Sequence, residues 1–217
     1  MTARPTKRPA KRPESRDSAT LCTRQVTIIG VGGVGRQLAL QLVALGVAKL
    51  TVIDSERVKE HHVRSAGYLA DDVGAWKVDA VGSLCHQTNP QLDFTGINDR
   101  VRPHHPRGDA VFCCVDALSA RKDVWRCAAS DRGFWADVRF DRETIQVLTA
   151  VDDRSRRAYA ASLAVARPAK RTTPLICEAT IGASLAVEQF LRYLRGKLSR
   201  DVRLDLTSGW DDAAHDE

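Results

Sequence analysis

A chain of 217 residues, 43% of them hydrophobic, is long enough to bury a sizeable core within one globular domain. The formal net charge of +6 is concentrated at the N-terminus, where residues 1–20 hold six Lys or Arg and two acidic residues, a net +4. The rest of the chain therefore carries +2, which argues against a specific nucleic-acid-binding face on the folded part.

Apolar runs and cysteines indicate the compartment. No run approaches the roughly 18 apolar residues that span a bilayer, and the N-terminus lacks the apolar core of a signal peptide. The six cysteines include no C-x-x-C pair, which excludes the usual zinc spacing and suits a reducing compartment. We expect a cytoplasmic protein without a membrane segment. It should have a disordered basic tail over 1–20, a single domain over 21–210 and an acidic tail over 211–217.

A glycine-rich turn follows the first predicted strand. The apolar, β-branched strand over 25–30 leads into Gly30-x-Gly32-Gly33-x-Gly35, and an apolar-periodic helix over 33–46 begins at once. Glycines allow a tight turn and let the backbone approach a phosphate without a Cβ in the way. The helix N-terminus then presents free N–H groups and the positive end of its dipole.

The second predicted strand, over 49–54, ends in a carboxylate. Asp54 follows the first glycine of the turn by 24 residues, which suits a side chain that accepts hydrogen bonds from ribose hydroxyls. The turn and Asp54 together predict a nucleotide site. Dinucleotide dehydrogenases and ATP-using adenylating enzymes share this pair of features, so the pair alone does not identify the nucleotide.

The remaining predicted elements complete an α/β fold. In chain order they are a loop with short helical turns over 55–72, a helix over 74–88, strands over 92–97 and 109–115, a helix over 118–131, a hairpin of strands over 134–140 and 144–151, a mobile connection with room for one strand over 153–174, a helix over 180–198 and an extended segment over 202–206. Strand–helix alternation followed by a hairpin predicts a Rossmann-like, mostly parallel sheet with an antiparallel extension. Ligands of such sheets bind beyond the carboxyl ends of the strands, where residues 30–35 and Asp116 both fall.

Three further segments accompany the glycine turn: Asp54-Ser-Glu-Arg-Val-Lys-Glu-His-His-Val-Arg-Ser65, Asp71-Asp-Val-Gly-Ala-Trp-Lys77 and Val115-Asp-Ala-Leu-Ser-Ala-Arg121. With the turn and the final helix segment Ile181-Gly-Ala-Ser-Leu-Ala-Val-Glu188, this set resembles the ThiF/MoeB/HesA family, which includes the adenylation domains of ubiquitin-activating enzymes. The resemblance covers about residues 25–198 and implies that the domain over 21–210 is an adenylation domain.

The resemblance implies ATP- and Mg²⁺-dependent adenylation of the C-terminal glycine of a small ubiquitin-like or sulfur-carrier protein. Asp54 would then take the ribose hydroxyls, Arg64 and Lys77 would hold the phosphates, and Asp116 would ligate Mg²⁺. The other positions implied at the nucleotide are Gly30, Gly32, Gly33, Gly35 and Glu56. A homodimer and a conjugating enzyme as a further partner are also implied, with Arg12 or Arg16 as a candidate to reach the neighbouring subunit's ATP.

The chain departs from the family motif at several positions. Glu56 stands where the family has Asp, His62 where it has Asn and Ser65 where it has Gln, and the segment is one residue short between His62 and Arg64. The zinc-binding cysteine pairs of many family members are absent. These departures give weight to a second reading, a degenerate scaffold that pairs with an active subunit.

Cys177 is the candidate for a thioester, because it lies after an Arg/Lys-bearing segment and just before the last predicted helix. Cations or a helix N-terminus would favour the thiolate. The alternative is a small buried residue among apolar neighbours, and the adjacent Glu178 would oppose ionisation.

The other candidate residues also have purely structural explanations. Asp116 alone suits a helix N-cap as well as a metal ligand, and Arg64 and Lys77 alone would pass as surface charges. His61 and His62 suit a solvent-facing loop as well as ligand contacts. A third function, an NAD(P)-dependent oxidoreductase, lacks an obvious acid/base pair and a substrate domain, while Arg64 and Lys77 suit a triphosphate.

Overall fold

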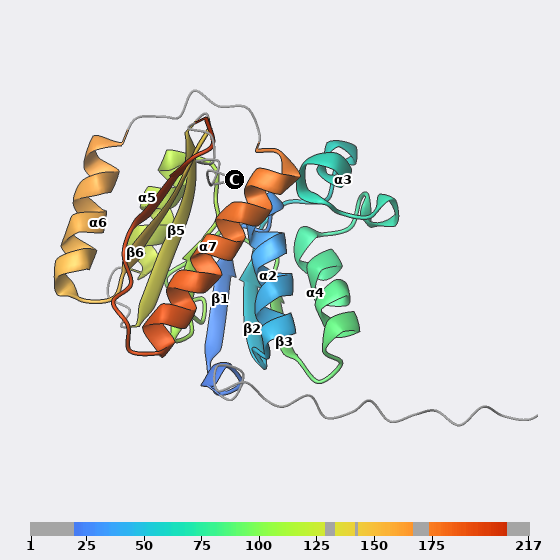
Figure 1. Ribbon diagram of the computed structural model, residues 1–217. Helices are drawn as coiled ribbons and strands as arrows, with labels where there is room; N and C mark the ends of the chain where they lie inside the picture. The colour runs from blue at the N-terminus through green and yellow to red at the C-terminus, as the bar shows by residue number, and fades with distance from the viewer. Residues whose placement is uncertain (1–19, 129–132, 142, 167–173, 208–217) are drawn as a thin grey trace, which may run out of the picture.

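A seven-stranded sheet in the order β3-β2-β1-β4-β5-β6-β7 forms the centre of the computed structural model, which describes residues 20–128, 133–141, 143–166 and 174–207 (Figure 1). The strands are β1 (Gln25–Ile29), β2 (Lys49–Ile53), β3 (Asp93–Ile97), β4 (Ala110–Cys113), β5 (Phe134–Asp141), β6 (Thr144–Ala150) and β7 (Val202–Asp205). The strands β1 to β5 pair in parallel, whereas β6 pairs antiparallel with both β5 and β7. The predicted α/β fold with an antiparallel extension is confirmed.

Helices cover both faces of the sheet. They are α2 (Gly33–Leu45), α3 (Glu60–Ala66), α4 (Lys77–Thr88), α5 (Leu118–Ala128), α6 (Asp153–Val165) and α7 (Ile176–Leu194), with a 3₁₀ turn η1 at Ala70–Asp72. The core under α2, α4 and α7 is one apolar cluster, and the core under α5 and α6 is another. In Figure 1, α7 crosses the front of the sheet beside α2.

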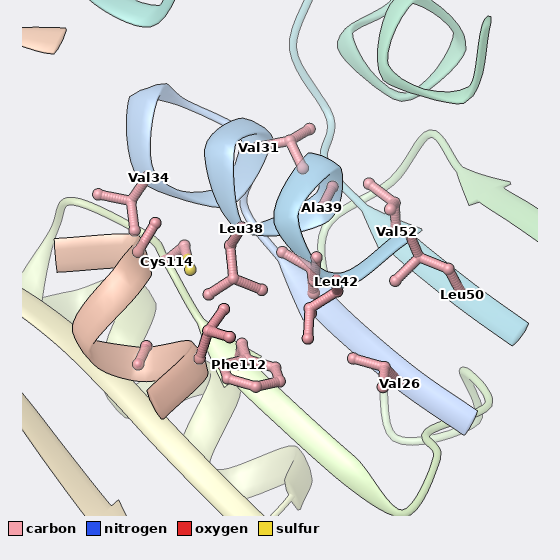
Figure 2. Close-up of a cluster of buried hydrophobic side chains, with 14 of the residues drawn as sticks. Val26, Val31, Val34, Leu38, Ala39, Leu42, Leu50, Val52, Phe112 and Cys114 are labelled. Atoms are coloured by element: carbon pink, nitrogen blue, oxygen red, sulfur yellow. The ribbon is translucent and has the colours of Figure 1, made fainter. Parts of the chain in front are cut away.

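Alternating strand residues supply the two cores. Phe112 of β4 belongs to the first core, whereas its neighbours Val111 and Cys113 belong to the second, as expected for side chains that point to opposite faces of a strand. Figure 2 shows Leu38 and Leu42 of α2 packed over the strand layer near Phe112. These buried faces hold the first residue of α2 at a fixed place above the sheet.

The sheet order places a topological switch point beside β1. The chain leaves β1 through α2 toward β2, but β4 returns on the other side of β1, which makes the β1/β4 pair the topological switch point. The register pairs Ile29 with both Ile53 and Cys113. The residues that follow these three strands therefore meet at the same carboxyl edge, as the sequence predicts.

The prediction of a mobile connection over 153–174 is wrong in its first part, where residues 153–165 form helix α6. Asp152 caps this helix, because its Oδ1 accepts a hydrogen bond of 2.7 Å from the Ser155 N–H. Tyr159 and Leu163 of α6 are buried in the second core. Residues 167–173 lie outside the described part of the chain.

Smaller differences concern the last helix and the termini. α7 begins at Ile176 and ends at Leu194, four residues earlier at each end than the predicted 180–198. The predicted tail residues 1–19 and 211–217 lie outside the described part of the chain. None of the helices in the described ranges combines the length and the apolar character that a bilayer crossing requires.

Candidate functional site

The glycine turn is built by two close backbone approaches. Gly30 has a φ of 86°, and a Cβ on it would lie 2.9 Å from the carbonyl oxygen of Cys114. A Cβ on Gly35 would overlap the carbonyl oxygen of Gly30. A Cβ on Gly33 would lie 3.1 Å from the Cβ of Ala179 in α7. Gly30 and Gly35 are therefore required by backbone conformation and packing, whereas a side chain at Gly33 would need Ala179 to shift slightly.

Gly32 differs from the other three glycines. Its φ of −66° is open to any residue, and a Cβ on it would have no atom of the described chain within 4 Å. Gly32 is the N-cap of α2, and no side chain caps this helix. The first turn of α2 therefore has no side-chain cap and open space beside its N-cap, which is the arrangement that binds phosphate at helix N-termini.

Asp54 ties the turn to the next strand. Its Oδ2 accepts a hydrogen bond of 2.8 Å from the Val31 N–H, and its Oδ1 accepts one of 2.8 Å from the Glu56 N–H. Burial raises the pKa of this carboxyl, while Lys77 and the two backbone donors act in the opposite direction. Each oxygen keeps a second lone pair, so the carboxylate retains acceptor capacity for the predicted hydrogen bonds from ribose hydroxyls.

Lys77 lies beside Asp54 as a buried cation. It is the first residue of α4, and its side chain is 5% exposed. Its Nζ donates to Oε2 of Glu56 at 2.6 Å, and this contact lowers the pKa of the Glu56 carboxyl. The structure thus brings Asp54, Glu56 and Lys77 together. The Glu56–Lys77 pair was not predicted, because the two residues lie 21 positions apart.

His62 has a structural contact within α3. Its Nδ1 accepts a hydrogen bond of 2.9 Å from the Lys59 N–H, which closes the first turn of the helix. Burial, followed by the nearby charge of Lys77, lowers the pKa of His62 to about 4. The imidazole is therefore neutral near pH 7, and its neighbour His61 is exposed.

Arg64 lies on the solvent-exposed side of α3. Two helical residues are about 200° apart around the axis, so Arg64 and His62 leave the helix on opposite sides. Arg64 is exposed, like Glu60 one turn earlier, whereas Ala66 is buried. Its predicted contact with phosphates stays a prediction.

Asp116 lies at the carboxyl end of β4, and its side chain is exposed. The N-cap position of α5 is Ala117, whose carbonyl oxygen accepts the Arg121 N–H at 3.0 Å. Asp116 is therefore one residue before the cap, which argues against the helix-cap reading. The described residues contain no cluster of three or more His, Cys, Asp or Glu that could hold a metal alone. One exposed carboxylate nevertheless fits Mg²⁺, which proteins often hold with one or two carboxylates plus substrate phosphates.

Cys177 is exposed and is the second residue of α7. Glu178 caps the same helix, since its Oε2 accepts a hydrogen bond of 2.8 Å from the Leu175 N–H. The close approach of Ala179 to Gly33 places this end of α7 beside the start of α2. The alternative that Cys177 is a small buried residue is wrong, because the side chain is exposed. Its thioester role stays a prediction.

Sequence reasoning missed a buried carboxylate in β5. Asp137 is fully buried, and it accepts hydrogen bonds from Arg121 Nε at 2.9 Å, Arg139 Nε at 2.6 Å and the Tyr159 hydroxyl at 3.0 Å. Arg121 also donates to the Asp116 carbonyl oxygen at 2.7 Å. The signal in the sequence was a lone acidic residue inside the apolar run Phe134-Trp-Ala-Asp-Val138.

Comparison with known proteins gives a family match over residues 11–197, to the model described as the ThiF family. The chain is 29% identical over 125 residues to ubiquitin-like modifier-activating enzyme 5 of Branchiostoma floridae, covering 50% of this chain and 31% of that protein. It is 28% identical over 110 residues to the sulfur carrier protein ThiS adenylyltransferase of Escherichia coli K12, covering 48% and 44%. The chain thus spans less than half the length of these relatives.

Solved structures support the same fold. E. coli MccB superposes with a TM-score of 0.71 at 13% identity, over 87% of this chain and 61% of that chain. PaaA superposes with a TM-score of 0.70 at 19% identity, over 89% of this chain and 73% of that chain. At this identity the likeness concerns the arrangement of helices and strands.

Proposed function

This chain belongs to the ThiF family, and from that premise we propose that it uses ATP to adenylate the C-terminal glycine of a small ubiquitin-like or sulfur-carrier protein. The observation that carries the proposal is the open position of Gly32 at the uncapped start of α2. Gly32 lies at the switch point of the sheet. Asp54 and Lys77 lie on the β2 side of this point, and Asp116 lies on the β4 side. The relatives named as a ThiS adenylyltransferase and a ubiquitin-like modifier-activating enzyme support this choice of substrate.

The proposed reaction needs positioned charge more than it needs a base. A carboxylate oxygen of the carrier protein's last glycine bonds to the α-phosphorus of ATP, and the bond to the pyrophosphate oxygen breaks. That carboxylate is already ionised at neutral pH. Negative charge that builds on the phosphate oxygens is stabilised by N–H groups and cations fixed in advance.

Each residue has one proposed role in this step. The N–H groups at the start of α2 and Lys77 contact phosphates, and Asp54 accepts hydrogen bonds from the ribose. Glu56 holds Lys77 beside the site until a phosphate takes over the ammonium group. Asp116 would hold Mg²⁺, which supplies positive charge to the phosphates when bound. Arg64 is proposed as a further phosphate contact.

Cys177 is the proposed acceptor in a second step. Its thiol loses a proton to solvent, the sulfur bonds to the carbonyl carbon of the adenylated glycine, and AMP leaves. Exposure and the position at the start of α7 support this role. A thiol-sensitive adduct with the carrier protein, absent in Cys177→Ser, is expected. An adduct that survives this substitution would exclude Cys177.

Pyrophosphate exchange into ATP tests the first step. The exchange should require Mg²⁺ and a carrier protein that ends in glycine, and Asp116→Ala should reduce it at least tenfold. Exchange by Asp116→Ala at the wild-type rate would show that the assigned role is wrong.

We propose that the protein is a homodimer and that a conjugating enzyme is a further partner. Analytical ultracentrifugation checks the dimer, and pull-down with the products of neighbouring genes checks the partner.

A second candidate function is a scaffold subunit that binds ATP without catalysis. The observation that favours it is the pairing of Lys77 by Glu56, together with the departures from the family motif at His62 and Ser65. Tight ATP binding without pyrophosphate exchange, across a panel of carrier proteins, would select this candidate over the enzyme.

A further inference from the structure

A buried network connects the Asp116 turn to strand β5 and helix α6. Asp137 of β5 is fully buried and has partners on both carboxylate oxygens. Oδ1 accepts a hydrogen bond from Arg121, and Oδ2 accepts hydrogen bonds from Arg139 and Tyr159. A buried carboxylate without partners would be strongly unfavourable, so the network holds each member in one arrangement.

Arg121 uses three of its nitrogen atoms on three different acceptors. Nε donates to Asp137, Nη2 donates to the Val138 carbonyl oxygen at 2.8 Å, and Nη1 donates to the Asp116 carbonyl oxygen at 2.7 Å. The guanidinium group is planar, so these three directions are fixed relative to one another. Holding β5 with two nitrogens therefore fixes where the third meets the Asp116 backbone.

The Asp116 side chain is exposed, and no residue in the described part of the chain forms a hydrogen bond with its carboxylate. Its backbone carbonyl oxygen is held by the hydrogen bond from Arg121 Nη1. A reacting group must lie within about 0.5 Å of its productive position to be effective. The guanidinium of Arg121 therefore holds the backbone from which the Asp116 carboxylate projects.

We propose that Asp137, acting through Arg121, is a positioning residue that directs the Asp116 carboxylate toward the divalent cation of the nucleotide site. The inference rests on the proposed role of Asp116 and adds to it a buried support that spans α5, β5 and α6. The two oxygens of Asp137 then differ in function. Oδ1 serves the site through Arg121, whereas Oδ2 anchors the carboxylate to Arg139 and Tyr159.

The test compares substitutions on the two sides of Asp137. Arg121→Lys keeps the positive charge but cannot reach Asp137 and the Asp116 carbonyl as a fork. Tyr159→Phe is the matched control, because it removes one buried hydrogen bond on the Oδ2 side and leaves Arg121 in place. Thermal unfolding is recorded for both, so that their losses of stability can be compared.

Two readouts separate positioning from a purely structural role. Hydrogen exchange at the amides of residues 115–118 reports whether the turn is held, and it needs no ligand. Titration of ATP against the protein at increasing Mg²⁺, and in EDTA, reports the contribution of the metal to binding.

We expect Arg121→Lys to exchange these amides at least tenfold faster, and to need at least tenfold more Mg²⁺ for half-maximal ATP binding, with unchanged affinity in EDTA. Tyr159→Phe should match wild type in both. Equal behaviour of the two variants, or failure of Arg121→Lys to fold, would assign Arg121 a structural role only and overturn the proposal. If wild type binds no ATP while the exchange difference is found, the proposed function fails and the support of the turn by Arg121 stands.

Discussion

At the residue scale, Gly32 and Gly35 serve the same turn for different reasons. Gly35→Ala places a Cβ against the Gly30 carbonyl oxygen, so we expect it to destabilise the fold by about 1–3 kcal/mol. Gly32→Ala meets open space at an allowed φ, so its stability should stay within about 0.5 kcal/mol of wild type. Its ATP affinity should nevertheless fall at least tenfold.

Urea unfolding and calorimetric titration of ATP measure the two effects separately. Wild-type ATP affinity in Gly32→Ala would show that no phosphate approaches this position.

We expect Lys77 to act mainly through ATP binding. Lys77→Gln removes the buried ammonium group, and a hydrogen bond to a charged partner contributes about 1.5–3 kcal/mol. ATP affinity should therefore fall by roughly one to two powers of ten. Lys49→Gln is the control, because Lys49 pairs with Asp93 at 3.5 Å on the surface, where such pairs contribute little. Equal affinities for Lys77→Gln and Lys49→Gln would contradict the assignment.

His62 predicts a pH dependence of stability. Its pKa in the folded chain, about 4, lies below the ordinary value of 6.5, so the unfolded chain binds more protons between these values. The contribution is complete above pH 6.5 and is lost as the pH falls toward 4. His62→Asn keeps an acceptor for the Lys59 N–H without this titration. Melting temperatures from pH 7 to 4.5 should fall more steeply in wild type than in His62→Asn, and parallel curves would refute the prediction.

At the element scale, α6 shows where the sequence pattern is insufficient. Its buried positions, Arg156, Tyr159 and Leu163, have the helical spacing of three and four residues. A charged residue at the first of them hides the apolar periodicity. The helices α2, α4 and α7 and most strands were predictable because apolar residues predominate at their buried positions, although α2, α4 and α7 also bury Arg36, Lys77 and Gln189. The glycine turn and Asp54 were predictable from short-range spacing, whereas the Glu56–Lys77 and Asp137 contacts join residues far apart in the chain.

The packing of α6 provides a stability test. Leu163 is buried against the second core, whereas Val165 at the end of the same helix is 81% exposed. Leu163→Ala should lower the free energy of unfolding by about 2–5 kcal/mol. Val165→Ala should change it by less than about 0.5 kcal/mol. Denaturant titrations of both variants check this, and a neutral Leu163→Ala would mean that α6 does not pack as described.

At the scale of the whole molecule, the strand order decides what the local features can do together. The turn after β1, Asp54 after β2 and Asp116 after β4 lie far apart in sequence but end at one edge of the sheet. A triphosphate placed at the start of α2 would lie between Lys77 and Asp116. A dinucleotide would use the turn and Asp54 but would leave Lys77 and Asp116 without an evident role.

The most direct measurement is therefore calorimetric titration of the full chain with ATP and with NAD at the same Mg²⁺ concentration. We predict that ATP binds at least tenfold more tightly than NAD, and that removal of Mg²⁺ weakens ATP binding only. Tighter binding of NAD, or binding of neither nucleotide, would contradict a triphosphate site at this edge of the sheet.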